Sequence, residues 1–308
     1  MKIRQILKLG GLVLLAGIVL AGCQKQKEEE KSPKYTIGVV TKSKNSEYWM
    51  SVCSGMEDAA EKENAEVVIL SPDSETDQKT QKKMIKDLLK MPIDALAVST
   101  VNSYDNADYI ELAKNRGIEV YAYDTPVSDV TLPYVGIDDE KVGYELGQVM
   151  AQKMNGTGNV AVIGGSTTQI CHEKRILGFK RCMEEYPGIK IETVKTGYSN
   201  LLVSEQDMKE ILEEYPDLDG IMTTSAVTAL GVAEATKESG ILVVTVDAQE
   251  DSIEAVKEGK ILAVGAQSGY DIGYETIEYM IESLEKKEIP GEKILDTKIL
   301  TKENVEEY

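Results

Sequence analysis

Polar side chains follow nearly every apolar, strand-like segment of this 308-residue sequence. Hydroxyl, amide and carboxylate groups together can donate to and accept from a small polar ligand. Any one of these residues is more often a turn residue or a helix cap, so the prediction rests on the collection. If the strands form parallel sheets, these residues share the edge where such sheets bind ligands. They are Lys42, Ser43, Asn45, Ser99, Asn102 and Asp124, then Ser166, Thr167, Tyr198, Thr224, Ser225, Asp247 and Gln267.

The sequence lacks the motifs of several catalytic and metal sites. His172 is the only histidine, which excludes HExxH and histidine-rich metal sites. No G-x-S-x-G segment follows a strand, no GxxxxGK[ST] occurs, and the glycines near Gly158 and Gly164 do not fit GxGxxG. We therefore predict a protein that is not an enzyme, with no metal and no cofactor. His172 is interpreted as an ordinary polar loop residue.

Short β-branched segments alternate with longer amphipathic segments from residue 35 onward. Continuous apolar runs such as residues 67–70 suit strands that are buried on both faces. Two consecutive series of similar size predict two doubly wound α/β lobes with parallel sheets. The expected strands are 35–40, 66–70, 95–99, 119–122, 159–163, 189–194, 220–223, 242–246, 262–265 and 293–299. The expected helices are 49–63, 78–89, 110–114, 140–155, 174–186, 205–215, 227–238, 252–258 and 273–286.

The N-terminus has the features of a secretory signal. Basic residues precede an apolar stretch at 12–20, which is too short to span a bilayer, and small residues precede Cys23. This segment resembles the lipobox of bacterial lipoproteins, which implies a signal peptide over residues 1–22 and lipidation of Cys23. The polar residues 23–34 are expected to tether the protein to the membrane outside the cytoplasm. A buried apolar helix followed by an incidental cysteine is the other interpretation.

Net charge narrows the possible binding partners, and the cysteine count bears on disulfide bonds. The formal net charge is -19 and no Lys/Arg cluster stands out, which argues against nucleic acid and against anionic membrane surfaces. With Cys23 lipidated, Cys53, Cys171 and Cys182 remain, an odd number. We favour unpaired thiols, with a Cys171–Cys182 bond as the alternative.

An ordered series of short motifs resembles the type 1 periplasmic binding proteins, in the ribose/galactose-binding branch that serves sugar ABC importers. The resemblance extends from residue 35 to about 305. It is carried by residues 37–40 (IGVV), 47–49 (EYW), 95–99 (ALAVS), 120–124 (VYAYD), 135–139 (VGIDD), 175–179 (RILGF), 215–220 (YPDLDG), 229–231 (ALG), 243–247 (VVTVD) and 266–267 (AQ).

The resemblance implies two lobes that are joined by three hinge crossings and close over a ligand in the cleft between them. The crossings are expected near Ile137, near Gln267 and Ser268, and near Leu295 and Asp296. The N-terminal lobe would then comprise residues 35–137 plus 268–295. The C-terminal lobe would comprise residues 138–267 plus 296–308.

The resemblance also implies a set of ligand-binding residues. Carboxylates that accept from paired hydroxyls, an arginine that donates to ring oxygens and an aromatic that covers the C–H face together suit a sugar. Trp49, the only tryptophan, could equally be a core residue. The expected set is Ser46, Tyr48, Trp49, Ser99 and Asp124 from the first lobe, with Arg175, Tyr198, Ser225, Asp247 and Gln267 from the second lobe and the hinge.

The sequence also departs from the ribose-binding pattern. Ser46, Ser99 and Ser225 stand where those proteins carry asparagine, and Thr125 stands where they carry arginine beside the aspartate. Shorter polar groups imply a roomier cleft and leave a non-sugar ligand open. Lys42 is an added cation, which is either paired to an acid or aimed at an anionic group of the ligand; we include it among the site residues.

These observations predict an extracytoplasmic solute-binding lipoprotein that captures a small polar ligand, a sugar, and delivers it to the membrane permease of an ABC importer. One alternative keeps the fold but makes the chain a ligand sensor that docks on a membrane receptor kinase. Another is a binding protein for a non-sugar ligand. A transcription regulator of the related repressor type is disfavoured because residues 1–34 hold a signal and a tether rather than a DNA-binding motif.

Overall fold

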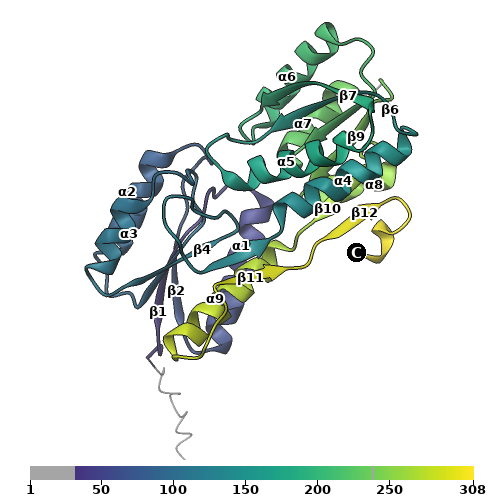
Figure 1. Cartoon of the computed structure of the whole chain (residues 1–308). Coiled ribbons are helices and arrows are strands. Elements are labelled where there is room, and N and C mark those ends of the chain that lie inside the picture. Colours follow the sequence, from purple (N-terminus) through teal and green to yellow (C-terminus); the bar gives the residue numbers. More distant parts are fainter. Residues whose placement is uncertain (1–31, 238) are drawn as a thin grey trace, which may run out of the picture. The chain divides into compact units, whose positions relative to one another are not determined.

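The computed structural model describes residues 32–237 and 239–308 (Figure 1). The expected signal peptide, Cys23 and nearly all of the tether lie outside the described residues. Residues 33–308 form one compact unit. None of the helices in the described ranges has the length and apolar character needed to cross a membrane.

The first lobe is built on a six-stranded sheet of order β11-β5-β4-β3-β1-β2, in which every neighbouring pair is parallel. The helices α1 and α9 pack against each other, while α2 contacts β1 and α3 contacts β4. The strands are β1 (Thr36–Val40), β2 (Glu66–Leu70), β3 (Ala95–Val98), β4 (Glu119–Tyr123), β5 (Tyr134–Ile137) and β11 (Glu292–Leu295). The helices are α1 (Glu47–Lys62), α2 (Gln78–Leu88), α3 (Ala107–Lys114) and α9 (Gly269–Leu284).

The second lobe repeats this plan with the sheet order β12-β10-β9-β8-β6-β7. The helices α4 and α5 form one packed pair and α6 and α7 another. The strands are β6 (Thr157–Gly164), β7 (Gly188–Thr196), β8 (Gly220–Thr223), β9 (Leu242–Val246), β10 (Ala263–Ala266) and β12 (Lys298–Thr301). The helices are α4 (Asp139–Lys153), α5 (Ile170–Glu184), α6 (Leu201–Glu214), α7 (Ala226–Thr236), α8 (Glu250–Glu258) and the 3-10 turn η1 (Val305–Glu307). The predicted two-lobed α/β architecture is confirmed.

Three details of the predicted elements were wrong. Strand β5 was missed, because four residues bounded by Pro133 and Asp138 are a short signal even though all four are buried. The strand expected at 293–299 is two strands, β11 and β12, separated by Asp296 and Thr297, and aspartate is depleted in strands. The second sheet is not wholly parallel, since β12 runs antiparallel to β10.

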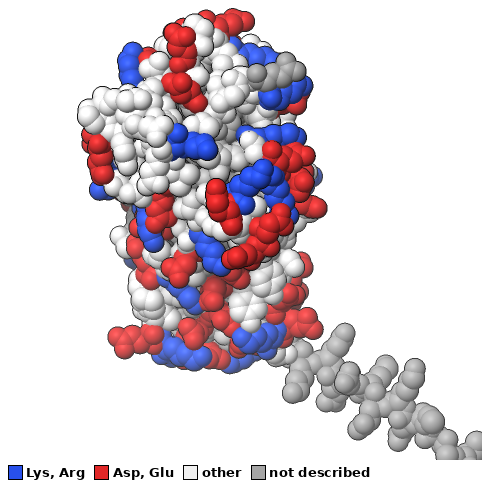
Figure 2. All heavy atoms as spheres, turned by 90° about the vertical axis from the view of Figure 1, so that its right-hand side faces the viewer, with Lys and Arg blue, Asp and Glu red and all other residues white. Residues whose placement is uncertain are grey.

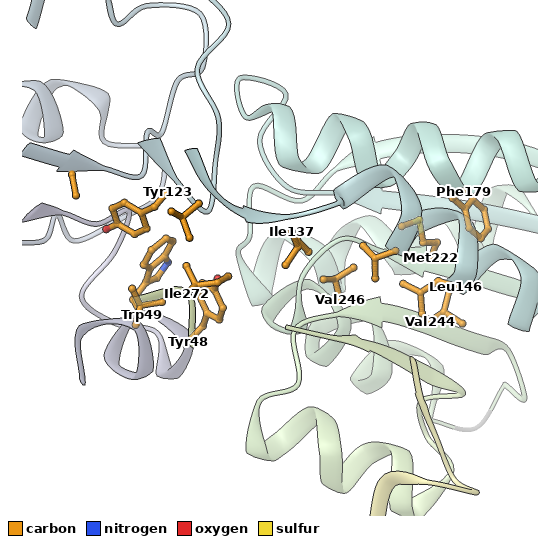
Figure 3. Packing of buried hydrophobic residues seen from close by; sticks show 14 of the residues in the cluster. Tyr48, Trp49, Tyr123, Ile137, Leu146, Phe179, Met222, Val244, Val246 and Ile272 are labelled. Atoms are coloured by element: carbon orange, nitrogen blue, oxygen red, sulfur yellow. The ribbon is translucent and has the colours of Figure 1, made fainter. Parts of the chain in front are cut away.

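The chain passes between the two sheets three times. It leaves β5 at Ile137 for α4, leaves β10 at Ala266 for α9, and leaves β11 at Leu295 for β12. One apolar cluster continues from one lobe to the other through Ile137. Figure 3 shows Ile137 between Tyr48, Trp49, Tyr123 and Ile272 of the first lobe and Leu146, Phe179, Met222, Val244 and Val246 of the second.

The outer surface carries charges of both signs. On the face drawn in Figure 2, Lys and Arg side chains lie interspersed with Asp and Glu. Many charged side chains of the described residues form exposed ion pairs, such as Lys44–Asp73 and Lys237–Glu234. Exposed pairs contribute little to stability, about 0–1 kcal/mol each. The charges that matter for function are therefore the few that are buried.

Candidate functional site

The loops that follow the carboxyl ends of the strands of both sheets meet between the two lobes, in a region that we call the cleft. Ser103 N–H donates to the Thr168 carbonyl at 2.8 Å, and Thr168 Oγ1 donates to the Val101 carbonyl at 2.8 Å. On another edge of the cleft, Glu250 N–H donates to Glu47 Oε1 at 3.1 Å. These bonds join loops of opposite lobes, so the structure represents a closed state.

Asp124 follows β4 and is held by four protein donors. Its backbone has a φ of 59°, a left-handed conformation that aspartate tolerates better than most residues. Tyr48 OH donates to Oδ1 at 2.8 Å, while Ser99 Oγ at 3.0 Å, Thr125 Oγ1 at 2.8 Å and Lys42 Nζ at 3.0 Å contact Oδ2. Burial raises the pKa of Asp124, but the charges of Lys42 and Arg175 outweigh burial and lower it. Asp124 is therefore a charged and saturated carboxylate.

Lys42, on the loop after β1, is the buried partner of Asp124 and is only 3% exposed. Besides Asp124, its Nζ donates to Thr125 Oγ1 at 2.8 Å and to Gln169 Oε1 at 2.9 Å, and it lies 5.3 Å from the centre of the Trp49 ring. Burial lowers the pKa of Lys42, but the charge of Asp124 more than reverses this effect. An ammonium has three N–H groups, and Lys42 donates all of them to acceptors of the protein. Of the two interpretations of Lys42, the structure favours pairing with an acid.

Arg175 lies on α5 and reaches the cleft from the second lobe. Its Nε donates to Asp139 Oδ1 at 2.8 Å, and its Nη1 donates to the Thr224 carbonyl at 2.8 Å. Asp139 begins α4, where the helix N-terminus favours a negative charge. Burial nevertheless raises the pKa of Asp139 to about 6, against the attraction of Arg175. Arg175 and Asp139 thus form a buried pair that fixes the guanidinium at the cleft.

Asp247 follows β9, at the position in the second sheet that Asp124 occupies in the first. Its φ is 77°. Gln267 Nε2 donates to its Oδ1 at 2.5 Å, and Arg175 Nη1 lies 4.0 Å from the same oxygen. Among the described residues, none donates to Oδ2. Burial raises the pKa of Asp247, and Arg175 offsets this only in part. This carboxylate keeps capacity for a ligand.

The remaining predicted residues have different surroundings. Ser46 and Ser225 are the N-caps of α1 and α7. Ser46 Oγ accepts from Gln249 Nε2 at 3.4 Å, and Ser225 Oγ lies 3.0 Å from Thr228 Oγ1. Trp49 is 2% exposed within the apolar cluster. Tyr198 is 51% exposed and, within the described part of the chain, its side chain forms no hydrogen bond with the cleft residues. Contact of Trp49 and Tyr198 with a ligand stays a prediction.

Sequence reasoning missed Gln169 and Asp139. Gln169 lies on the loop after β6, and the rule that found the other residues, a polar side chain beyond a strand, applies to it as well. Asp139 follows β5, the strand that was not assigned, so the same rule had no strand to act on.

The prediction for His172 was wrong, and no position in the site was predicted for Cys171. His172 is a buried residue of α5 rather than a loop residue, and its Nδ1 lies 2.9 Å from Thr224 Oγ1. Burial, together with Arg175 and Lys42, lowers the pKa of His172 well below its usual value, so the ring is neutral. Cys171 lies 3.2 Å from Thr125 Oγ1 and, like Cys53 and Cys182, is a free thiol.

Two larger hollows formed by the described residues lie away from the cleft. One of 600 Å³ is lined by Ile118, Val120 and Pro133, at the amino ends of β4 and β5. Another of 460 Å³ is lined by Leu242 and Leu262, at the amino ends of β9 and β10. Because ligands of open parallel sheets bind beyond the carboxyl ends of the strands, the cleft is the candidate site.

Comparison with known proteins agrees with this geometry. Residues 37–288 match the family described as periplasmic binding protein domain. The chain is 26% identical over 273 residues to a D-ribose/D-allose-binding protein of Pseudomonas aeruginosa, which covers 82% of this chain and 85% of that protein. It is 27% identical over 267 residues to a xylitol-binding protein of Mycolicibacterium smegmatis, with 84% and 76% covered. A solute-binding protein of Actinobacillus succinogenes, solved with bound D-allose, has the same fold, with a TM-score of 0.84, 24% identity, and 89% of this chain and all of that one covered.

Proposed function

The chain belongs to the periplasmic binding protein family, and from this premise we propose that it captures a sugar or sugar-like polyol outside the cytoplasm and delivers it to the permease of an ABC importer. The observation that carries the proposal is the convergence of Asp247 and Arg175, from the second lobe, on a cleft that the first lobe closes. An unsaturated carboxylate beside a fixed guanidinium suits the hydroxyl groups of a small polar ligand. The names of the two relatives, a ribose/allose binder and a xylitol binder, support the sugar and polyol class.

We assign the ligand-binding role to the predicted set within the lobes 35–137 plus 268–295 and 138–267 plus 296–308. In this assignment Asp247, Arg175, Gln267 and Ser225 contact the ligand from the second lobe. Ser46, Tyr48 and Ser99 complete the site from the first lobe, while Lys42 and Asp124 position its wall. The protein binds and releases its ligand without catalysis.

Ligand-dependent closure is the physical basis of the delivery step. The closed state buries both lobes' polar loops against each other, and a ligand that contacts both lobes shifts the population toward this state. The closed pair of lobes then presents one joint surface to the permease.

We further propose that lipid on Cys23 anchors the protein to the membrane. A basic region, a short apolar stretch and small residues before this cysteine support the assignment. Replacement Cys23→Ser should move the protein from the membrane fraction to the soluble extracytoplasmic fraction and abolish labelling with a radioactive fatty acid. Unchanged membrane association without labelling would contradict the anchor.

A ligand panel tests the binding function. The purified protein is titrated by calorimetry with pentoses, hexoses and polyols, and with nucleosides and amino acids for contrast. The emission of Trp49, the only tryptophan, is followed in parallel because Lys42 lies over its ring. We expect saturable binding of at least one sugar or polyol with a change in Trp49 emission. Binding confined to nucleosides or amino acids would contradict the sugar class.

An uptake assay tests the delivery step. Cells that lack this chain should lose uptake of the radiolabelled ligand, and the Asp247→Asn variant should not restore it, whereas Asp217→Asn, an exposed substitution, should. Normal uptake in cells without the chain would contradict import and would favour a sensing role for the same binding site.

A further inference from the structure

The charged groups buried in the closed cleft include more carboxylates than cations. Two cations, Lys42 and Arg175, and three carboxylates, Asp124, Asp139 and Asp247, are each no more than 8% exposed. The partly buried Glu75, whose Oε1 accepts from Trp49 Nε1 at 2.9 Å, adds to the negative side. The other titratable groups contribute no charge, because burial lowers the pKa of His172 far below its usual value and raises the pKa of Cys171 to about 11.

The distances identify which carboxylate lacks a cation. Lys42 Nζ lies 3.0 Å from Asp124 Oδ2, and Arg175 Nε lies 2.8 Å from Asp139 Oδ1. Both cations are thereby committed at close range. Asp247 is left with Gln267, a neutral donor, and with Arg175 Nη1 at 4.0 Å. A third buried carboxylate therefore stands without an ion-pair partner of its own.

A buried charge without a partner is costly, so a binding partner that supplies the opposite charge gains affinity. Among the described residues, no group of three or more His, Cys, Asp or Glu side chains is arranged to hold a metal ion. A cationic ligand would supply the missing charge.

Resting on the proposed binding function, we infer that the preferred ligand is a polyhydroxylated amine of the amino-sugar class, with its ammonium group on Asp247 Oδ2. The hydroxyls face Arg175 and the serine side chains of the cleft, as they would for a neutral sugar. The ammonium donates to Asp247 Oδ2, an oxygen to which none of the described residues donates. The ion pair is enclosed when the lobes close, where charge-assisted hydrogen bonds are stronger than neutral ones.

Matched ligand pairs test this inference. Glucosamine and glucose, galactosamine and galactose, and mannosamine and mannose are titrated into the purified protein at neutral pH. We expect at least one amine to bind about tenfold or more tightly than its hydroxyl counterpart, a difference of about 1.4 kcal/mol or more. A neutral sugar that binds as tightly as its amine, or tighter than every amine, would overturn the inference and leave the binding function standing. Binding of none of these six sugars, with a pentose or polyol bound instead, would overturn the inference alone, and binding of no sugar or polyol at all would remove both.

A charge-removing variant assigns the preference to Asp247. Asparagine tolerates the left-handed backbone at this position, so Asp247→Asn is expected to fold. It should bind the amine about tenfold more weakly and bring the two members of a pair to within about threefold. The control Asp217→Asn removes an exposed carboxylate and should keep the preference. Should Asp247→Asn fail to fold, the wild-type comparison of the pairs still decides. An amine preference that survives in folded Asp247→Asn would overturn the assignment to this residue.

Discussion

The two lobes place an aspartate at equivalent positions and use it differently. Asp124 follows β4 and Asp247 follows β9, and each strand is the fourth from the β2 or β7 edge of its sheet. Both residues have a positive φ. Asp124 is surrounded by four donors, one of them the buried Lys42, whereas Asp247 has a single close donor, Gln267. The fold sets where the carboxylate stands, and the neighbouring loops decide whether it serves the protein or a ligand.

The side chains after the first strand of each sheet produce this difference. Lys42 follows β1, and the corresponding loop after β6 carries Ser166 instead. A lysine at this point can reach the aspartate two strands away, and a serine cannot. The same architecture, repeated in the two lobes, thus holds Asp124 as a carboxylate bonded within the protein and Asp247 as a carboxylate that can bind a ligand.

The largest expected effect is a difference in unfolding free energy between variants of the two aspartates. Asp124→Asn should lower the free energy of unfolding by about 3–5 kcal/mol, because it leaves the ammonium of Lys42 buried without its partner. Asp247→Asn should change this free energy by less than about 1 kcal/mol, since it removes no ion pair of its own. Urea denaturation of both variants gives the measurement. Equal losses in the two variants would end the distinction between them.

A double substitution tests whether Lys42 stabilises the protein through Asp124. Lys42→Met alone should destabilise the protein by about 3 kcal/mol, because Asp124 then lacks its cation. Together with Asp124→Asn, the loss should be smaller than the sum of the single losses by about 2–3 kcal/mol. Additive losses in urea denaturation would mean that Lys42 and Asp124 act independently.

The buried carboxylate of Asp139 makes stability depend on pH. Its pKa is about 6 in the folded protein against an ordinary value of 3.8. The folded state therefore binds the proton more tightly, so the stability that Asp139 contributes is present below pH 3.8 and is lost as the pH rises through 6. Relative to Asp139→Asn, the wild type should lose about 2 kcal/mol between pH 4.5 and pH 7. A pH-independent difference between the two unfolding free energies would contradict this.

The smallest effect concerns closure of the lobes. Ser103 Oγ accepts from Ile170 N–H across the cleft at 3.1 Å, and Ser103 is fully buried. Ser103→Ala leaves this N–H without an acceptor in the closed state only, which should weaken ligand binding about fivefold, or about 1 kcal/mol. The exposed substitution Ser54→Ala is the matched control and should leave the affinity unchanged. Calorimetric titration distinguishes the two.

Sequence patterns alone were sufficient to predict two α/β lobes, because alternating β-branched and amphipathic segments have periods that differ clearly, whereas the bounds of the lobes came from the family resemblance. They also led to Asp124 and Asp247, which follow long apolar strands. They could not separate the roles of these two residues, since the difference depends on contacts between segments far apart in the chain. The pairing of Lys42 with Asp124 and Gln169 is of this kind. Asp139 escaped prediction for a local reason, the shortness of β5.

The first lobe cannot be completed until the end of the chain is available. Helix α9 packs on α1, and β11 pairs with β5, so residues 269–295 finish a core that began at residue 36. The second lobe draws all but β12 and η1 from one continuous segment. Contacts between distant segments form slowly, because the loop between them must close first. Folding should therefore start in the second lobe, and pulsed hydrogen exchange should protect α4 and α5 before α1. A chain that crosses the membrane N-terminus first would expose an unfinished first lobe until residues 269–295 have followed.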